Sequence, residues 1–240
     1  MLLDVQGITK RFGGLTAVRD LSLGLDRGQI VALIGPNGAG KTTAFNVISG
    51  FYKANSGKVL FDSKDISNLR PDQICKLGLA RTFQVVRPFQ GISVLDNVMV
   101  GAYSRTNDTS AARAKAEEVL EFLGMQRLSG QMGSGLPIAG RKRLEIARAL
   151  ATDPKMILLD ETMAGLRPGE AEEVIEMVRK MSERGIGILL VEHVMKVVMS
   201  LAERIVVIHH GEKIAEGVPS DVVQNKQVID AYLGEADVAG

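Results

Sequence analysis

The amino-acid sequence predicts an α/β fold in which a largely parallel sheet carries a phosphate-binding loop. Three observations support this prediction. A short apolar run, Ile30 to Ile34, leads directly into the glycine-rich segment GPNGAGKTT at residues 35–43. Residues 153–240 alternate apolar runs with amphipathic segments, as the strands and helices of a parallel sheet do. Residues 87–152 have a mostly helical pattern, so we expect a helical subdomain inserted into a core of residues 1–86 and 153–240.

Composition and charge limit the classes of protein to which the chain can belong. With 240 residues and 45% hydrophobic composition, the chain can bury a core of its own. Its 29 Lys and Arg residues against 28 Asp and Glu residues leave a net charge of +1, so nucleic acid is not an expected partner. The single cysteine, Cys75, excludes an intrachain disulfide and, with no leader-like segment before Asp4, favours a reducing cytosol.

The first part of the chain is predicted to form an antiparallel β subdomain beside the parallel sheet. Residues 2–12 alternate weakly, and Leu21 to Leu25 continue the pattern, as β-strands do. Ser56–Gly57 before the sequence KVLFD predicts the turn of a hairpin, and Arg70–Pro71 predicts a turn into a short helix.

The helical insertion is defined by two apolar stripes. Residues 108–123 place alanine, valine and leucine on one helical face, and Gly124 is a natural end for that helix. A second stripe consists of Leu144, Ala147, Leu150 and Ala151. We therefore predict at least two packed helices in this part of the chain.

The core resumes after the insertion with strands at residues 156–159, 186–191 and 205–208. A helix is predicted from Pro168 to Arg184, because proline is suited to the first helical position, glutamates follow in the first turn and arginine and lysine come near the end. This order of elements predicts parallel pairing of the strands.

Residues 35–43 fit the pattern G-x-x-x-x-G-K-T of the P-loop. In this pattern, backbone N–H groups surround a phosphate chain, a lysine reaches the terminal phosphates and a threonine hydroxyl binds Mg²⁺. A helix from Thr43 to Ser49, ended by Gly50, would hold the phosphates at the positive end of its dipole. A structural glycine turn is the alternative, and a dinucleotide fingerprint would need glycine at Thr43. The expected contacts of a nucleoside triphosphate are Gly35, Asn37, Gly38, Ala39, Gly40, Lys41, Thr42 and Thr43.

Two carboxylates, Asp160 and Glu161, follow the predicted strand at residues 156–159. Ligands of open α/β sheets gather at the carboxyl ends of strands, so both side chains are expected at the nucleotide. We expect Asp160 to hold Mg²⁺ through water, and Glu161 to polarise the attacking water while Lys41 stabilises phosphoryl charge. An acidic turn that merely ends the strand is the alternative.

The order of the motifs along nearly the whole chain resembles that of ABC-transporter ATPase subunits. After the P-loop come RTFQ at 81–84, LPIAGRKRLEIARAL at 136–150, ILLDE at 157–161 and VEH at 191–193. The resemblance implies a P-loop NTPase core of ABC type that binds ATP and Mg²⁺. It also implies that Phe12 stacks on adenine, that Gln84 lies near Mg²⁺ and water, and that His193 contacts the γ-phosphate. A core phenylalanine, a surface amide and a strand-end histidine are the corresponding structural alternatives.

A finer resemblance links the chain to the ATPase subunits of branched-chain amino-acid importers. It rests on SVLDNVMVGAY at 93–103, AGLRP at 164–168, VEHVMKVVM at 191–199 and AYLGE at 231–235. The resemblance implies a peripheral subunit on the cytoplasmic face of the cell membrane, paired with a second ATPase subunit. Its other partners would be membrane permeases, docked on the helical insertion and the groove after Gln84, and indirectly a solute-binding protein. A non-transport ABC ATPase and a weakly catalytic regulatory subunit remain as alternatives.

The signature motif departs from the family pattern. The family sequence LSGGQ presents a serine hydroxyl and glycine N–H groups to the ATP held by the opposite subunit, whereas this chain has LPIAG at Leu136 to Gly140. Pro137 suits the first helical position, and the N–H groups of Ile138, Ala139 and Gly140 are still expected to face an anion. We hypothesise that this change weakens one of two composite sites in a heterodimer, although a homodimer is also possible.

Overall fold

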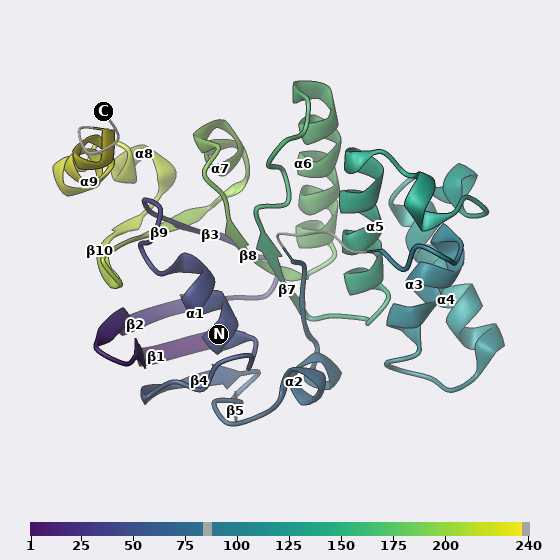
Figure 1. The fold of residues 1–240 in the computed structure, drawn as a ribbon, viewed down its shortest axis with the longest axis horizontal. Helices are drawn as coiled ribbons and strands as arrows, with labels where there is room; N and C mark the ends of the chain where they lie inside the picture. The colour runs from purple at the N-terminus through teal and green to yellow at the C-terminus, as the bar shows by residue number, and fades with distance from the viewer. Residues whose placement is uncertain (84–87, 237–240) are drawn as a thin grey trace.

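The computed structural model describes residues 1–83 and 88–236, and its strands there form two sheets (Figure 1). The antiparallel sheet has the order β2-β1-β4-β5 and consists of β1 Leu3–Phe12, β2 Leu15–Leu25, β4 Ser56–Phe61 and β5 Lys64–Asp65. The larger sheet has the order β10-β9-β3-β8-β7-β6. Its strands are β3 Ile30–Ile34, β6 Leu79–Arg81, β7 Met156–Asp160, β8 Gly187–Val191, β9 Arg204–His209 and β10 Glu212–Gly217. All of its pairs are parallel except β9 with β10.

The helices gather in groups around the larger sheet. Those between β6 and β7 lie at one end of the molecule, and α8 and α9 lie at the other (Figure 1). The α-helices are α1 Lys41–Ile48, α2 Pro71–Leu77, α3 Val94–Ala102, α4 Thr109–Phe122, α5 Ile138–Leu150, α6 Pro168–Glu183, α7 Met195–Leu201, α8 Pro219–Val222 and α9 Lys226–Ala236. Two 3₁₀ turns, η1 Gln126–Leu128 and η2 Gly133–Gly135, precede α5. In the described part of the chain, every helix is too short or too polar to cross a lipid bilayer.

The strand β3 lies between two hydrophobic cores. Its residues Ile30, Ala32 and Ile34 pack in a core with the helices α3 to α7, while Val31 and Leu33 pack in a core with α1 and the antiparallel sheet. Successive side chains of a strand point to opposite faces, so a strand covered on both faces is apolar at every position. This double burial fixes the position of the strand that leads into the glycine-rich loop.

The predicted fold class is confirmed, and most predicted elements occur within two residues of their expected bounds. The predicted hairpin turn at Ser56–Gly57 is wrong, because both residues lie inside β4. A Cβ atom on Gly57 would lie 2.4 Å from the Gly7 carbonyl oxygen, so this glycine permits the close approach of β1 and β4. The turn instead falls between β4 and β5, at Asp62 and Ser63, which both have positive φ.

Candidate functional site

The predicted site segments meet at one edge of the larger sheet. The strands β3, β8 and β7 are neighbours and run parallel, so their carboxyl ends lie side by side. The glycine-rich loop follows β3, Glu161 follows β7, and His193 comes two residues after β8. Segments more than a hundred residues apart in sequence are therefore brought together by the topology of the sheet.

Two glycines shape the loop between β3 and α1. Gly35 has a φ angle of 152°, and a Cβ atom there would lie 2.0 Å from the Ile208 carbonyl oxygen. Gly40, at the N-cap of α1, has a φ angle of 104°, and its Cβ atom would lie 2.3 Å from the Ala17 carbonyl oxygen. Any other residue would collide with the backbone at either position, so the close fit of this loop depends on glycine.

The Lys41 side chain lies inside this loop. It is buried, and its Nζ atom donates hydrogen bonds to the carbonyl oxygens of Gly35 at 2.6 Å and Pro36 at 2.7 Å. At the tip of the loop, Asn37 and Gly38 are exposed. The predicted contacts Ala39 and Thr43 are buried and half-buried, respectively, while Thr42 is exposed on the first turn of α1. The helix begins at Lys41, two residues earlier than the sequence predicted.

Asp160, the last residue of β7, forms a buried ion pair with Arg81 at the end of the neighbouring strand β6. The Arg81 Nη2 atom lies 2.9 Å from Asp160 Oδ2, and the two side chains are 8% and 3% exposed. Arg81 Nη1 also donates to Asn46 Oδ1 at 2.6 Å and to Ser49 Oγ at 3.0 Å. Burial raises the pKa of Asp160, while Arg81 and the nearby Lys41 ammonium lower it. Arg81, for which the sequence predicted no individual role, therefore links α1 to the acidic end of β7.

Glu161 and His193 lie close to each other at the sheet edge. The distance between Glu161 Oε1 and His193 Nδ1 is 3.9 Å, and the histidine side chain is 55% exposed. Glu161 has a φ angle of 47°, which is unfavourable for a residue with a side chain. Such strain persists only where neighbouring groups hold the backbone, and it is common at functional sites.

The altered signature segment forms the start of α5. Pro137 occupies the N-cap and not the predicted first helical position, because its backbone remains extended with a ψ angle of 168°. Its carbonyl oxygen accepts the first helical hydrogen bond, from Arg141 N–H at 2.9 Å. The N–H groups of Ile138, Ala139 and Gly140 precede that bond and belong to the first turn of the helix. Ile138 is 60% exposed and Ala139 is half-buried, whereas Gly140 is buried.

Two further predicted residues lie away from the sheet edge or outside the described residues. Phe12, at the end of β1, is 42% exposed and makes an edge-to-face contact with Tyr52, with 5.2 Å between ring centres. The Lys10 Nζ atom lies 5.0 Å from the centre of the Phe12 ring. Tyr52, which no sequence motif marked, thus shares the exposed aromatic surface. Gln84 lies outside the described residues.

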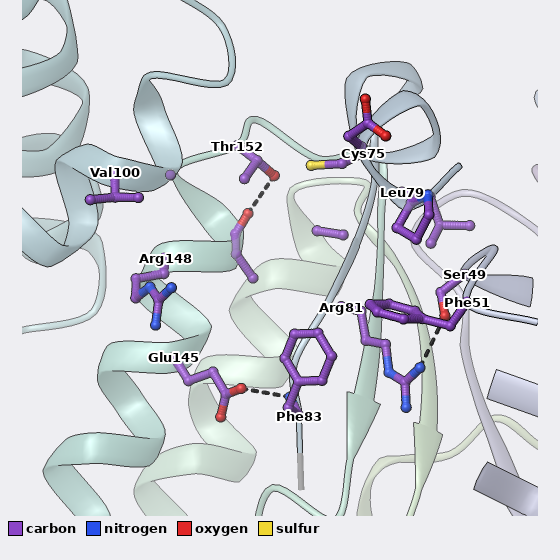
Figure 2. A pocket seen from close by; sticks show the side chains of 15 residues that line it. Ser49, Phe51, Cys75, Leu79, Arg81, Phe83, Val100, Glu145, Arg148 and Thr152 are labelled. Carbon is purple, nitrogen blue, oxygen red and sulfur yellow. Dashed lines mark hydrogen bonds between the residues drawn. The ribbon is translucent and has the colours of Figure 1, made fainter. Parts of the chain in front are cut away.

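A cavity of about 330 Å³ opens beside Arg81, between α5 and α3 on one side and the end of α1 with α2 on the other (Figure 2). Its rim includes two exposed aromatic rings, Phe51 and Phe83, in edge-to-face contact with ring centres 5.7 Å apart. The Arg81 guanidinium lies 5.6 Å and 5.3 Å from these ring centres. The cavity is therefore a mainly apolar opening with the Arg81 side chain in its wall.

Glu145 on α5 extends toward this cavity and accepts a hydrogen bond from the Phe83 N–H at 2.6 Å (Figure 2). Burial raises the pKa of this carboxyl to about 7, although the Phe83 hydrogen bond, Arg148 and Lys142 oppose the shift. The folded chain therefore binds this proton more tightly than the unfolded chain, in which the ordinary pKa is 4.5. The resulting cost to folding grows as the pH rises from about 4.5 to about 7 and is complete above that range.

We expect the substitution Glu145→Gln to be more stabilising, relative to wild type, at pH 8.5 than at pH 5. The reason is that glutamine accepts the same hydrogen bond without a buried charge. The difference in unfolding free energy between variant and wild type should become more favourable by on the order of 1–3 kcal/mol over this pH range. Urea denaturation at both pH values measures it. Glu118→Gln on α4, where the carboxylate is exposed, is the matched control. A variant-to-wild-type difference that does not change with pH would show that Glu145 carries no such cost.

The family model described as "ABC transporter" matches residues 18–164, and "Branched-chain amino acid ATP-binding cassette transporter" matches residues 212–238. The chain is 41% identical to the high-affinity branched-chain amino acid transport ATP-binding protein LivG of Salmonella typhimurium, over 98% of each chain. The ADP conformation of MJ1267, an ATP-binding cassette, superposes with a TM-score of 0.89 at 34% identity, covering 97% of this chain and 98% of that one. A dimeric post-hydrolysis structure of the cassette MJ0796, bound to ADP and Pi, has a TM-score of 0.80 at 25% identity, over 90% and 98% of the two chains.

Proposed function

Because the chain belongs to the ABC transporter family of ATP-binding proteins, we propose that it is the ATP-hydrolysing subunit of an importer for branched-chain amino acids. The observation that carries the enzymatic part is the meeting of three segments at one sheet edge: the loop around Lys41, Glu161 and His193. The substrate class rests on the names of the relatives and on the C-terminal family match.

The glycine-rich loop fits the phosphates of ATP. Its close backbone turns at Gly35 and Gly40 leave main-chain N–H groups at the start of α1, where a helix dipole also favours negative charge. Lys41 lies within the loop and provides the mobile positive charge for the terminal phosphates. Phe12, exposed next to Tyr52, offers a ring face for the adenine base.

The residues also fit a magnesium ion, which takes hard oxygen donors and usually needs only one or two carboxylates from the protein. We assign the Thr42 hydroxyl, the Asp160 carboxylate and Gln84 to this ion. Mg²⁺ supplies charge neutralisation at the β- and γ-phosphate oxygens when it is bound. The ion pair with Arg81 uses Asp160 Oδ2 and holds the carboxylate in a fixed orientation.

Glu161 is the general base in this proposal. Its carboxylate would accept a proton from the water that attacks the γ-phosphate, and His193, 3.9 Å away, would contact the γ-phosphate. Lys41 would stabilise the charge on the transferred phosphoryl group. These roles give each residue at the sheet edge a distinct task.

A second ATPase subunit is part of the proposal, because α5 starts at the protein surface with Pro137 and Ile138 exposed. Its N–H groups, at residues 138–140, can bind an anion held by another subunit, although the proline at 137 supplies no hydroxyl. The dimeric cassette MJ0796 supports pairing of such subunits. Whether the partner is identical or different decides whether both composite sites carry the altered signature.

Membrane permease subunits are the other proposed partners, and they place the chain peripherally at the cytoplasmic face of the membrane. The surface proposed for docking is the cavity rimmed by Phe51 and Phe83, since exposed aromatic rings around an apolar opening are characteristic of binding sites for other proteins. Contact with the solute-binding protein would be indirect, through the permease.

We expect Phe83→Ser to reduce recovery of membrane subunits with the tagged chain at least tenfold while ATP binding by the chain stays unchanged. The Phe83 ring is 48% exposed, so its loss removes apolar docking surface while leaving most of the core intact. Purification from membranes, with identification of the bound subunits, provides the measurement. Val218→Ser, a change of an equally exposed apolar side chain just before α8, is the control for general loss of apolar surface. If Phe83→Ser recovers as much permease as the wild-type chain does, this docking surface is excluded. If the wild-type chain itself recovers no membrane subunits, the proposed transport function is contradicted.

A further inference from the structure

The segment Glu161 to Ala164, which carries the proposed general base, is held in an unfavourable backbone conformation. Glu161 has a φ angle of 47°, a region that residues with a side chain rarely adopt. Its N–H donates to the Val191 carbonyl oxygen at 2.9 Å, and the Ala164 N–H donates back to the Glu161 carbonyl oxygen at 3.3 Å. These bonds form a tight turn whose middle residues, Thr162 and Met163, are buried. Further contacts are needed to keep a residue such as Glu161 in an unfavourable conformation.

Lys142 provides two such contacts from α5. This lysine is buried, and its Nζ atom donates to the Glu161 carbonyl oxygen at 3.0 Å and to the Ala164 carbonyl oxygen at 2.6 Å. Both ends of the turn are therefore bonded to one ammonium group. Lys142 lies four residues after Ile138, one turn along the helix whose first turn is the altered signature.

Glu192, which follows β8, also bonds this turn. This carboxylate lies at the end of β8, directly before His193, and is 2% exposed. Its Oε1 atom accepts a hydrogen bond from the Met163 N–H at 2.9 Å, and its Oε2 atom is buried without a hydrogen-bond partner among the described residues. A cation thus holds two carbonyl groups of the turn, and an anion holds an N–H group between them.

Burial of these two charged groups removes their solvation by water, which is unfavourable unless contacts with the protein compensate for it. Burial lowers the pKa of Lys142, and the carboxylates of Glu192, Glu145 and Glu161 act in the opposite direction. Burial raises the pKa of Glu192, against the effects of the Met163 N–H, His193 and Lys142. A methionine at position 142 would avoid the cost to the lysine, but it would leave both carbonyl groups without these donors.

We propose that Lys142 is a positioning residue for ATP hydrolysis, which fixes the Glu161 carboxylate by bonding both ends of the turn that carries it. This role rests on the proposed function of Glu161. Because Lys142 belongs to α5, a displacement of the signature helix is transmitted directly to the general base. Catalytic groups displaced by about 1 Å lose on the order of 10²-fold in rate, so even modest loosening of the turn affects turnover.

The test compares Lys142→Met, Lys142→Arg and a matched control in the full-length chain. Arg143→Met is the control, because Arg143 comes from the same helix and also bonds a carbonyl, that of Leu123 at 2.8 Å, but points away from the turn. We expect Lys142→Met to lower kcat between tenfold and a hundredfold with KM for ATP changed less than twofold. Lys142→Arg, which retains donors for both carbonyls, should recover at least a third of the wild-type kcat. Arg143→Met should lower the unfolding free energy without lowering kcat more than twofold.

Two results would overturn this role. One is a folded Lys142→Met variant with kcat within twofold of wild type, and the other is an equal loss of kcat in Arg143→Met. If Lys142→Met does not fold, Lys142→Gln takes its place, because its shorter amide can reach one carbonyl at most, and a loss below threefold would have the same meaning. Absence of turnover in the wild-type chain would instead contradict the proposed function itself, so the two failures are distinguishable.

Discussion

Replacing Glu161 with glutamine is expected to lower kcat for ATP hydrolysis by about 10²–10³-fold, within the usual contribution of a general base. Glutamine has nearly the same shape as glutamate but cannot accept the proton of the attacking water. Because the backbone contacts of this residue involve its N–H and carbonyl groups, the turn should remain intact. The dissociation constant for ATP with magnesium should therefore change less than about threefold. Phosphate release and equilibrium binding, measured on the same preparation, separate these two effects.

The control for this substitution is Glu170→Gln. The Glu170 carboxylate accepts a hydrogen bond from the Arg167 N–H at the start of α6 and is not part of the proposed site. Its kcat should stay within twofold of wild type. Glu161 would lose its assigned role if Glu161→Gln kept more than a tenth of the wild-type turnover.

The second large effect is expected from Arg81→Met, which leaves the buried Asp160 carboxylate without its ion-pair partner. Removal of one partner from a buried pair typically costs 3–5 kcal/mol, because the remaining charge is neither solvated nor compensated. The substitution also removes hydrogen bonds to Asn46 and Ser49. We therefore expect the unfolding free energy at pH 8 to fall by at least about 3 kcal/mol, as measured by urea denaturation.

A second variant isolates the ion pair from the other contacts of Arg81. In the Arg81→Met background, Asp160→Asn removes the stranded charge and should restore about 1–3 kcal/mol of the loss. Arg70→Met breaks an exposed pair with Asp72 and should change stability far less than Arg81→Met, because water already solvates both charges. An effect of Arg81→Met no larger than that of Arg70→Met would contradict the structural importance of the buried pair.

Much of the fold and the position of the candidate site could be predicted, because both are marked by patterns of apolar, glycine and charged residues within short segments of the sequence. The strand at Ile30–Ile34 is apolar at every position and is followed by glycines whose conformations no other residue adopts. The helix at residues 168–183 has a proline at its start and charges that complement its dipole. Because neighbouring parallel strands have their carboxyl ends at the same edge of the sheet, the segments that follow β3, β7 and β8 lie close together.

The hairpin was mispredicted because its turn lacks the usual signal. Asp62 and Ser63 adopt positive φ without a glycine, whereas Gly57, which looked like a turn residue, lies inside β4 at a register shift with β1. The helix α7, Met195–Leu201, was also missed. Its valine-rich sequence continues the apolar pattern of the strand before it, so the sequence gives no clear boundary between them.

The buried contacts that organise the site were beyond sequence reasoning. Arg81 and Asp160 are 79 positions apart, and Lys142 reaches the turn at Glu161 from a different helix. The residues next to Arg81, Asp160 and Lys142 in the sequence are equally compatible with exposed charged side chains at these positions. Only the packed structure shows which charged side chains are buried and which groups they contact. The one available signal was the position of Arg81 at the end of a short apolar strand, directly before the predicted Gln84 segment.

The roles proposed for Glu161, His193 and Lys142 all require that the loop around Lys41 binds the phosphates of ATP. Calorimetric titration of the folded chain with ATP in the presence of magnesium measures this binding. We expect saturable binding of one nucleotide per chain, with much weaker binding when the chain carries Lys41→Ala. The absence of any ATP uptake by the folded wild-type chain would rule out nucleotide binding by this loop and, with it, the proposed ATPase function.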